Sequence, residues 1–340
     1  MSKVTLAVKY RPTDFSDVVE QDSIKVILQQ QLETDSTKNA YLFVGGAGTG
    51  KTTCARIFAN EINKHEGAPV ELDAASNSSV DDVREIIQQA KTKSLDSEYK
   101  VFIIDECHSL SNTAWQAFLK LIEEPPAKSV FIFCTTNPEK IPKTILSRVQ
   151  RYDFRRLSNK GIVDRLWYIL EQEEIRTRDN QTDEALEYLS KLADGGMRDA
   201  ISLMDKCLSY SKDLTIENVI KALGVANYDT MMSITDAVLE DNAGYIIEQI
   251  ETVYSEGKDL KQFIKDYTNF ILDVKKYMIL GEFEYLQIPQ TKHMEEWLDS
   301  VKDYDKISDL LSALINLNST IKYDSSPKYT IEAYMLEVIK

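Results

Sequence analysis

Short apolar runs alternate with longer amphipathic segments between residues 40 and 155. The apolar runs are rich in β-branched and aromatic residues, which is typical of buried strands, and the longer segments have helical periodicity. This alternation predicts a parallel sheet covered by helices. The predicted strands are Tyr41–Val44, Val70–Leu72, Val101–Ile104, Val130–Cys134 and Arg151–Phe154, and the helices between them are Lys51–Lys64, Val80–Lys93 and Thr113–Glu123.

The strand pattern ends after Leu157, and the remainder of the chain has a helical pattern only. A first set of short helices, broken at Gly195-Gly196, extends to Leu223. Beyond it, apolar residues from Leu260 to Met278 recur at helical spacing, and we interpret this stripe as core or subunit interface. We therefore expect an α/β domain at residues 1–157, followed by all-helical domains at 158–224 and 225–340.

One stretch between a predicted strand and a predicted helix has the pattern G-x-x-x-x-G-K-[ST] of a phosphate-binding P-loop. Its glycines let backbone N–H groups point at phosphate oxygens, and the following helix N-terminus adds partial positive charge. Lys51 is placed to reach the β- and γ-phosphates, and the Thr52 hydroxyl to bind Mg²⁺. A nucleoside triphosphate is the predicted ligand. The stretch is Gly45-Gly46-Ala47-Gly48-Thr49-Gly50-Lys51-Thr52.

Two carboxylates, Asp105 and Glu106, directly follow the apolar run Val101–Ile104. Asp105 fits the Mg²⁺ shell, which is the Walker-B role. Glu106 fits a general base for the attacking water. Acidic pairs at strand ends are common, but one placed downstream of a P-loop is specific. The nearby His108 could extend this site, but we favour a structural or capping role for it.

Further polar residues are candidates for contacts to phosphates. Thr135-Thr136-Asn137 follows the strand Val130–Cys134, where a polar side chain can sense the γ-phosphate. Arg148 lies on a loop that closes the sheet domain, and an arginine there can stabilise phosphoryl-transfer charge in a neighbouring subunit. Arg198 is in the first turn of a predicted helix, and it faces the phosphates if the helical domain folds over the nucleotide.

The formal net charge of −15 is unevenly distributed, because acidic and basic residues balance within residues 1–160. A basic zone at residues 140–160 favours a local anionic contact, although a solvated charged face explains each member equally well. The four cysteines have no C-x-x-C spacing, so we expect reduced core thiols. Met1–Thr5 has no signal-peptide character, and no apolar run approaches a membrane helix. We expect a cytoplasmic protein without membrane contact.

Several stretches together resemble the gamma/tau subunits of bacterial DNA polymerase III, which are AAA+ clamp-loader ATPases. The resemblance is dense over residues 5–222 and continues to Lys340 mainly as helical pattern. Besides the P-loop, the stretches are Thr5–Pro12 with Phe15–Val19, Glu71–Asn77, Asp105–His108, Phe118–Pro126, Thr144–Arg148 and Met197–Ala200.

The resemblance implies a P-loop AAA+ domain at 1–157, a lid at 158–224 and an oligomerisation collar at 225–340. It implies ATP and Mg²⁺ as ligands, with Thr52 and Asp105 at the metal and Glu106 as the base. Thr136, or less directly Asn137, takes the sensor-1 role. The other implied roles are Arg148 as arginine finger acting on a neighbouring subunit, Arg198 as sensor 2, Tyr10, Arg11, Pro12, Val18 and Val19 around the adenine, and Gly45, Gly46, Ala47, Gly48, Thr49, Gly50, Lys51, Thr52 and Thr53 around the phosphates.

Three departures from the family pattern stand out. The family carries a cysteine-rich zinc module after the P-loop helix, whereas Asn60–Pro69 joins the helix to the next strand directly, so we expect no zinc. The family's Ser-Arg-Cys element reads Ser147-Arg148-Val149, which keeps the arginine and changes its support. No residues follow the collar, so we expect a compact member without the tau extension.

A contact with DNA is open to two interpretations. Ser78 and Ser79 precede the predicted helix Val80–Lys93, where amides and hydroxyls suit a backbone phosphate. N-capping of that helix explains the same residues, and we favour capping. Asn112-Thr113 stands where relatives often carry a basic residue, which weakens the prediction of DNA binding.

The resemblance implies a clamp-loader ATPase that assembles with other clamp-loader subunits, as a pentamer, and loads a sliding clamp onto primer–template DNA. Polymerase activity is not expected from this chain. One alternative is another AAA+ DNA-remodelling ATPase, acting in branch migration or helicase loading. A second is a non-catalytic clamp-loader scaffold, against which the intact P-loop, Asp105-Glu106 and Arg198 argue.

Overall fold

The computed structural model describes residues 4–76, 80–92, 94, 96–175, 178–224, 228–257, 259–322 and 324–339, and the side chains of residues 80–82 are not among them. The chain divides into two compact units. The first comprises Met1–Thr177 with Ala193–Asp205, and the second comprises Arg178–Leu192 with Lys206–Lys340. The domain limits at residues 157 and 224 stay predictions.

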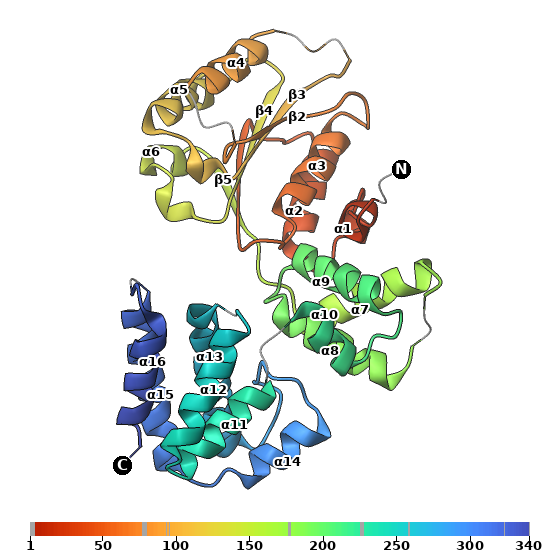
Figure 1. The fold of residues 1–340 in the computed structure, drawn as a ribbon. Helices are drawn as coiled ribbons and strands as arrows, with labels where there is room; N and C mark the ends of the chain where they lie inside the picture. Colours follow the sequence, from red (N-terminus) through yellow and green to blue (C-terminus); the bar gives the residue numbers. More distant parts are fainter. Residues whose placement is uncertain are drawn as a thin grey trace. The chain divides into compact units, whose positions relative to one another are not determined.

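The first unit is built on a five-stranded sheet in which every strand pair is parallel (Figure 1). The strand order is β2-β3-β4-β1-β5. Parallel pairing places the carboxyl ends of all five strands at one edge of the sheet. The strands are β1 (Ala40–Val44), β2 (Val70–Asp73), β3 (Lys100–Asp105), β4 (Ser129–Thr135) and β5 (Gln150–Asp153).

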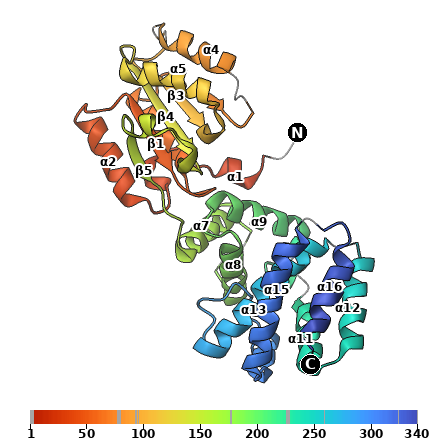
Figure 2. The ribbon, with the colours of Figure 1, turned by 90° about the vertical axis from the view of Figure 1, so that its left-hand side faces the viewer.

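Helices cover both faces of this sheet (Figures 1 and 2). Alternate strand residues point to opposite faces, so Leu42 packs toward α4, α5 and α6, while Phe43 packs toward α2 and α3. Both side chains are fully buried, which explains the uninterrupted apolar runs. The helices of this unit, not all of which pack on the sheet, are α1 (Leu6–Lys9), α2 (Asp22–Glu33), α3 (Lys51–Ile62), α4 (Val80–Ala90), α5 (Asn112–Glu123), α6 (Lys143–Leu146), α7 (Asn159–Gln172) and α9 (Met197–Tyr210), the last of which continues into the second unit.

The predicted parallel α/β fold is confirmed, with the expected strands and intervening helices displaced by at most a few residues. The segment between α3 and β2 is short, as the direct junction at Asn60–Pro69 predicts. All four cysteines are buried and unpaired, as expected of core thiols. The helix α2 was not predicted, although Ile24 and Leu28 lie on its buried face.

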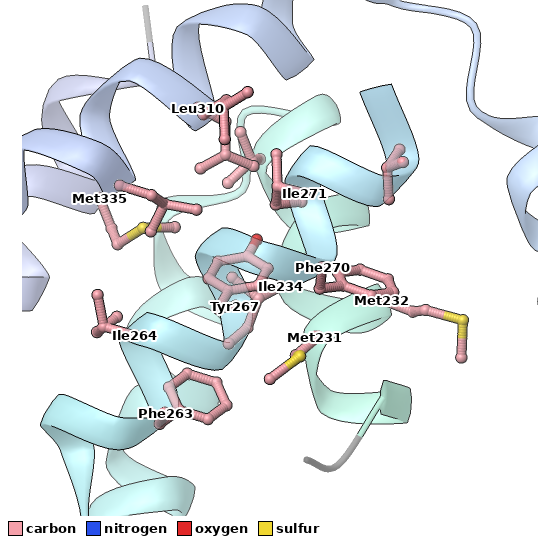
Figure 3. Close-up of a cluster of buried hydrophobic side chains, with 14 of the residues drawn as sticks. Met231, Met232, Ile234, Phe263, Ile264, Tyr267, Phe270, Ile271, Leu310 and Met335 are labelled. Carbon is pink, nitrogen blue, oxygen red and sulfur yellow. The ribbon is translucent and has the colours of Figure 1, made fainter. Parts of the chain in front are cut away.

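The second unit is helical in all its described elements. The helix α13 supplies its central stripe, because Phe263, Ile264, Tyr267, Phe270 and Ile271 all point into one apolar cluster (Figure 3). The predicted stripe is therefore core in this unit. The helices that lie wholly within this unit are α8 (Asn180–Leu192), α10 (Ile216–Leu223), α11 (Tyr228–Leu239), α12 (Ala243–Ser255), α13 (Leu260–Leu280), α14 (Lys292–Ser300), α15 (Tyr304–Ile321) and α16 (Pro327–Glu337).

No helix within the described part of the chain has the length and apolar character needed to cross a membrane. In the same part of the chain, no three His, Cys, Asp or Glu residues gather in a group that could hold a metal ion.

Candidate nucleotide-binding site

The P-loop follows β1 at the carboxyl edge of the sheet and leads directly into α3. Two of its glycines have a positive φ, 67° at Gly48 and 101° at Gly50, and residues that carry a Cβ rarely adopt this conformation. Gly50 is the N-cap residue of α3, whose first residue is Lys51. The loop therefore wraps tightly before the helix begins, which is the geometry of an anion-binding helix N-terminus.

Lys51 is bent back over this loop. Its Nζ donates to the carbonyl oxygen of Gly45 at 3.0 Å and to that of Gly46 at 2.6 Å. The residue is only 5% exposed, and burial lowers the pKa of its ammonium group, with Cys134, Glu106 and Asp105 acting in the opposite direction. A phosphate at the loop would supply the anionic partner that two neutral carbonyl groups replace only in part.

The start of α3 meets the end of β3. Thr52 Oγ1 donates a hydrogen bond of 2.8 Å to Asp105 Oδ2. A hydroxyl and a carboxylate side by side are hard oxygen ligands of the kind that Mg²⁺ prefers, and Mg²⁺ at such sites keeps several waters and binds the substrate phosphates. The donor set thus fits a magnesium ion bound together with a triphosphate.

Glu106 is held in a left-handed backbone conformation, with φ of 46°. Its Oε2 accepts a hydrogen bond of 3.1 Å from Thr136 Oγ1 and lies 3.1 Å from His108 Nδ1. His108 Nδ1 is also 3.2 Å from Thr135 Oγ1, which is fully buried. One carboxylate oxygen of Glu106 is therefore fixed by groups at the ends of β3 and β4, and the structure describes no partner for the other, Oε1.

A cavity of about 740 Å³ lies over these residues. This volume is in the range of small-molecule sites. Most of the predicted binding residues line it, including the Walker-B pair and Arg198, while Gly45, Gly46 and Thr136 are not among the lining residues. The predicted residues that line it are Tyr10, Arg11, Pro12, Val18, Val19, Ala47, Gly48, Thr49, Gly50, Lys51, Thr52, Thr53, Asp105, Glu106 and Arg198.

Arg198 is brought to the cavity by direct contact between the P-loop and the start of α9. Met197 N donates to Gly48 O at 3.0 Å. A Cβ built on Gly48 would lie 2.9 Å from the Cα of Gly196, so the two backbones touch where neither residue carries a side chain. Leu157 N also donates to Gly195 O at 3.1 Å. Gly196, one of the two glycines at which the sequence predicts a helix break, is thus in backbone contact with the P-loop.

The predicted adenine side is anchored to helical segments of the same unit. The Tyr10 hydroxyl donates to Glu173 Oε1 at 2.6 Å, and Arg165 Nη2 donates to Tyr10 O at 3.1 Å. Leu6 N donates to Asp205 Oδ2 at 3.2 Å. The N-terminal segment therefore bridges α7 and α9 beside the cavity.

Two residues near the site, Arg165 and Gln21, were not predicted from the sequence, and for a third, His108, two interpretations were open. Arg165 was not singled out, and its place on α7 gives no sequence signal. Gln21 pairs its side-chain amide with the backbone of Arg155, with bonds of 2.7 and 3.2 Å, and also has no motif. His108 was interpreted as structural or capping, with an extension of the site as the alternative, and it lies beside Glu106. Its place three residues after Asp105 was the available signal.

Arg148 lies elsewhere and is not among the residues that line the cavity. Its guanidinium contacts Glu123 at the end of α5. Two other arginines of the basic zone are also paired with carboxylates, Arg151 with Asp153 and Arg156 with Asp194. The candidate DNA contacts Ser78 and Ser79 fall outside the described residues.

A parallel sheet in the order β2-β3-β4-β1-β5, with a P-loop after the first strand and an acidic pair after the third, defines a P-loop domain of the AAA+ class. The comparisons with known proteins agree. Solved structures of the RuvB Holliday junction branch migration motor of Thermotoga maritima share the fold, with a TM-score of 0.53 and 18% identity over 86% of this chain and 99% of that one.

Sequence comparisons find relatives among the subunits of DNA polymerase III. Residues 70–158 match the model of the DNA polymerase III delta subunit, and residues 161–213 match the ATPase lid domain of DNA polymerase III clamp loader subunits. The chain is 34% identical to the DNA polymerase III subunit tau of Bacillus subtilis over 99% of its length, and 34% identical to the gamma/tau subunit of Mycoplasma pneumoniae over 81%. The chain is a homologue of the DNA polymerase III gamma/tau subunits. It spans 63% and 43% of the length of these two relatives.

Proposed function

We propose that the chain is an ATP-hydrolysing subunit of a clamp loader, which uses ATP to load a sliding clamp onto primed DNA. The observation that carries the proposal is the joining of Thr52 to Asp105 at 2.8 Å beside Glu106, below a cavity lined by the P-loop. A chain that only scaffolds a complex has no need of this donor set. The homology to gamma/tau subunits supports the choice among AAA+ functions.

The roles of the residues follow from their positions. The P-loop amides and Lys51 bind the phosphates of ATP, and Thr52 and Asp105 hold Mg²⁺ in place. Mg²⁺ bound there would supply positive charge to neutralise the charge that develops on the phosphates during transfer. The aromatic and apolar residues Tyr10, Pro12 and Val18, with Arg11 and Val19, surround the adenine.

Glu106 orients the attacking water and accepts its proton. Its Oε2 is held by the Thr136 hydroxyl, which leaves Oε1 for the water. Thr136 thereby links the base to the end of β4, where it acts as the sensor-1 residue. Arg198 reaches the phosphates from the start of α9, which rests on the P-loop through Gly48.

Each site is completed by the neighbouring subunit. Arg148 lies away from the cavity of its own chain, so we assign it to the ATP of the adjacent subunit. Residues 1–157 then form the motor domain, residues 158–224 form the lid and residues 225–340 form the collar. Through the collar, the chain assembles with companion clamp-loader subunits into a ring of five. The partners are the sliding clamp and primer–template DNA, and no zinc takes part.

The fold likeness to a branch-migration motor supports an alternative only at the level of fold, since its identity to this chain is 18%. The two functions differ in what stimulates hydrolysis. We expect the assembled complex to hydrolyse ATP faster when both the clamp and primed DNA are present, with no movement along the duplex. Stimulation by a four-way junction alone, with strand exchange and no response to the clamp, would overturn the proposal in favour of branch migration.

A further inference from the structure

The side chain of Glu123 contacts Arg148, the arginine that we propose acts on the ATP of the adjacent subunit. Arg148 Nη2 lies 2.8 Å from Glu123 Oε1. Arg148 Nη1 donates to Thr144 O at 2.8 Å and to Ser147 Oγ at 3.1 Å. The guanidinium is thus fixed by acceptors at two places: Glu123 at the end of α5, and Thr144 of α6 with Ser147 directly after that helix.

Both of these elements are attached to the core of the sheet domain. Ile145 of α6 is 1% exposed and belongs to the cluster that also contains Phe118 and Ile122 of α5. Val149, which stands where the family pattern has a cysteine, packs against the same cluster. A guanidinium tied to two such anchors has a defined orientation relative to the sheet.

The pair is open to an approaching ligand. The Arg148 side chain is 39% exposed and that of Glu123 is 44% exposed. The three bonds use three of the five N–H donors of a guanidinium, so two donors remain for an anionic group. An ion pair this exposed contributes little to the stability of a protein. The ion pair therefore determines the direction of the two free N–H donors and has little effect on the stability of the fold.

We propose that Glu123 is a positioning residue that aims Arg148 at the ATP of the adjacent subunit, an inference that rests on the proposed function. A free arginine side chain samples many rotamers, and ordering it in the transition state costs conformational entropy. Glu123 removes part of that cost by fixing the guanidinium before the subunits meet. The carboxylate does not touch the nucleotide, so it acts only through Arg148.

The test compares four variants of the full chain, each assembled with its companion subunits: Arg148→Ala, Glu123→Ala, Glu123→Gln and Glu124→Ala. Glu124 is the next residue along and an exposed carboxylate, so its removal matches the charge change at Glu123. Steady-state hydrolysis with the clamp and primed DNA gives kcat and KM. Fluorescent-nucleotide titration of each variant chain gives its own affinity, and native mass spectrometry reports assembly.

We expect Glu123→Ala to lower kcat roughly tenfold, as for a misplaced catalytic group, with KM, nucleotide affinity and assembly unchanged. Glu123→Gln keeps an acceptor and should recover part of the rate, while Glu124→Ala should match the wild type. A slow Arg148→Ala together with a wild-type or faster Glu123→Ala overturns the role of Glu123 alone. A wild-type rate for Arg148→Ala overturns the arginine-finger assignment and the role of Glu123 with it.

Discussion

The contact between the P-loop and the start of α9 offers a sharp test of the site, through the substitution Gly48→Ala. The added Cβ meets backbone atoms only, at 2.9 Å from Gly196 Cα, 3.1 Å from Gly196 C and 3.3 Å from Met197 N. No side chain can rotate away to relieve this crowding. Either the P-loop or the start of α9 must move, and the bond from Met197 N to Gly48 O is strained in both cases.

The expected destabilisation has two parts. A non-glycine residue at a φ of 67° costs about 1 kcal/mol. Crowding of a packed contact costs a further 1–3 kcal/mol, roughly. Displacement of α9 also moves Arg198 away from the phosphates that we propose it contacts. Loss of one charge-assisted hydrogen bond, about 1.5–3 kcal/mol, weakens nucleotide binding by roughly tenfold to a hundredfold.

Gly281→Ala is the matched control. Gly281 has a φ of 70°, nearly that of Gly48, and a Cβ built there meets no atom within 4 Å. Calorimetric unfolding should show a small loss for Gly281→Ala and a larger one for Gly48→Ala. Titration with a fluorescent ATP analogue should show weaker binding for Gly48→Ala only. Equal destabilisation by both variants, with wild-type nucleotide affinity, would refute the account of the contact.

Three further outcomes are expected. Glu106→Gln should lower kcat at least a hundredfold in the assembled complex while the chain still binds ATP, as a general base requires; an unchanged turnover contradicts this role. Phe118→Ala should lower the free energy of unfolding by about 3–5 kcal/mol in denaturant titrations, because the ring is fully buried against Phe133. A loss below about 1 kcal/mol would contradict this packing, because it would mean that neighbouring side chains fill the cavity left by the ring. Burial raises the pKa of the Cys207 thiol to about 11. The unfolded thiol ionises at lower pH, so its contribution to stability is complete below the unfolded pKa and is lost as the pH rises toward 11. Iodoacetamide at pH 8 should therefore label Cys207 far faster after denaturation, and equal rates would contradict the burial.

The sheet and its helices were predictable because each strand is short, apolar and flanked by helical periodicity. The same runs do not reveal which residue faces which layer. Leu42 and Phe43 are equally apolar and both fully buried, yet they pack on opposite faces of the sheet. Only the pairing of strands far apart in sequence decides this, and that information is not local.

The motif residues of the candidate site were predictable for a related reason. Thr52 and Asp105 lie at the start of α3 and the end of β3, and a parallel sheet brings these ends to one edge. The supports of the site were not predictable. The bond from Met197 N to Gly48 O joins backbone groups, so no side chain marks it in the sequence. The pairing of Glu123 with Arg148 likewise joins two charged residues in a chain rich in both signs.

Mixing two inactive variants tests most directly whether the ATP site is shared between adjacent subunits, as we propose. Glu106→Gln keeps Arg148 but loses the base, and Arg148→Ala keeps the base but loses the finger. We predict that each variant alone hydrolyses ATP very slowly with the clamp and primed DNA. An equal mixture should recover roughly a quarter of the wild-type rate, because randomly assembled neighbours combine one intact base with one intact arginine. A mixture that assembles normally and stays as slow as its components would contradict a site completed by the adjacent subunit.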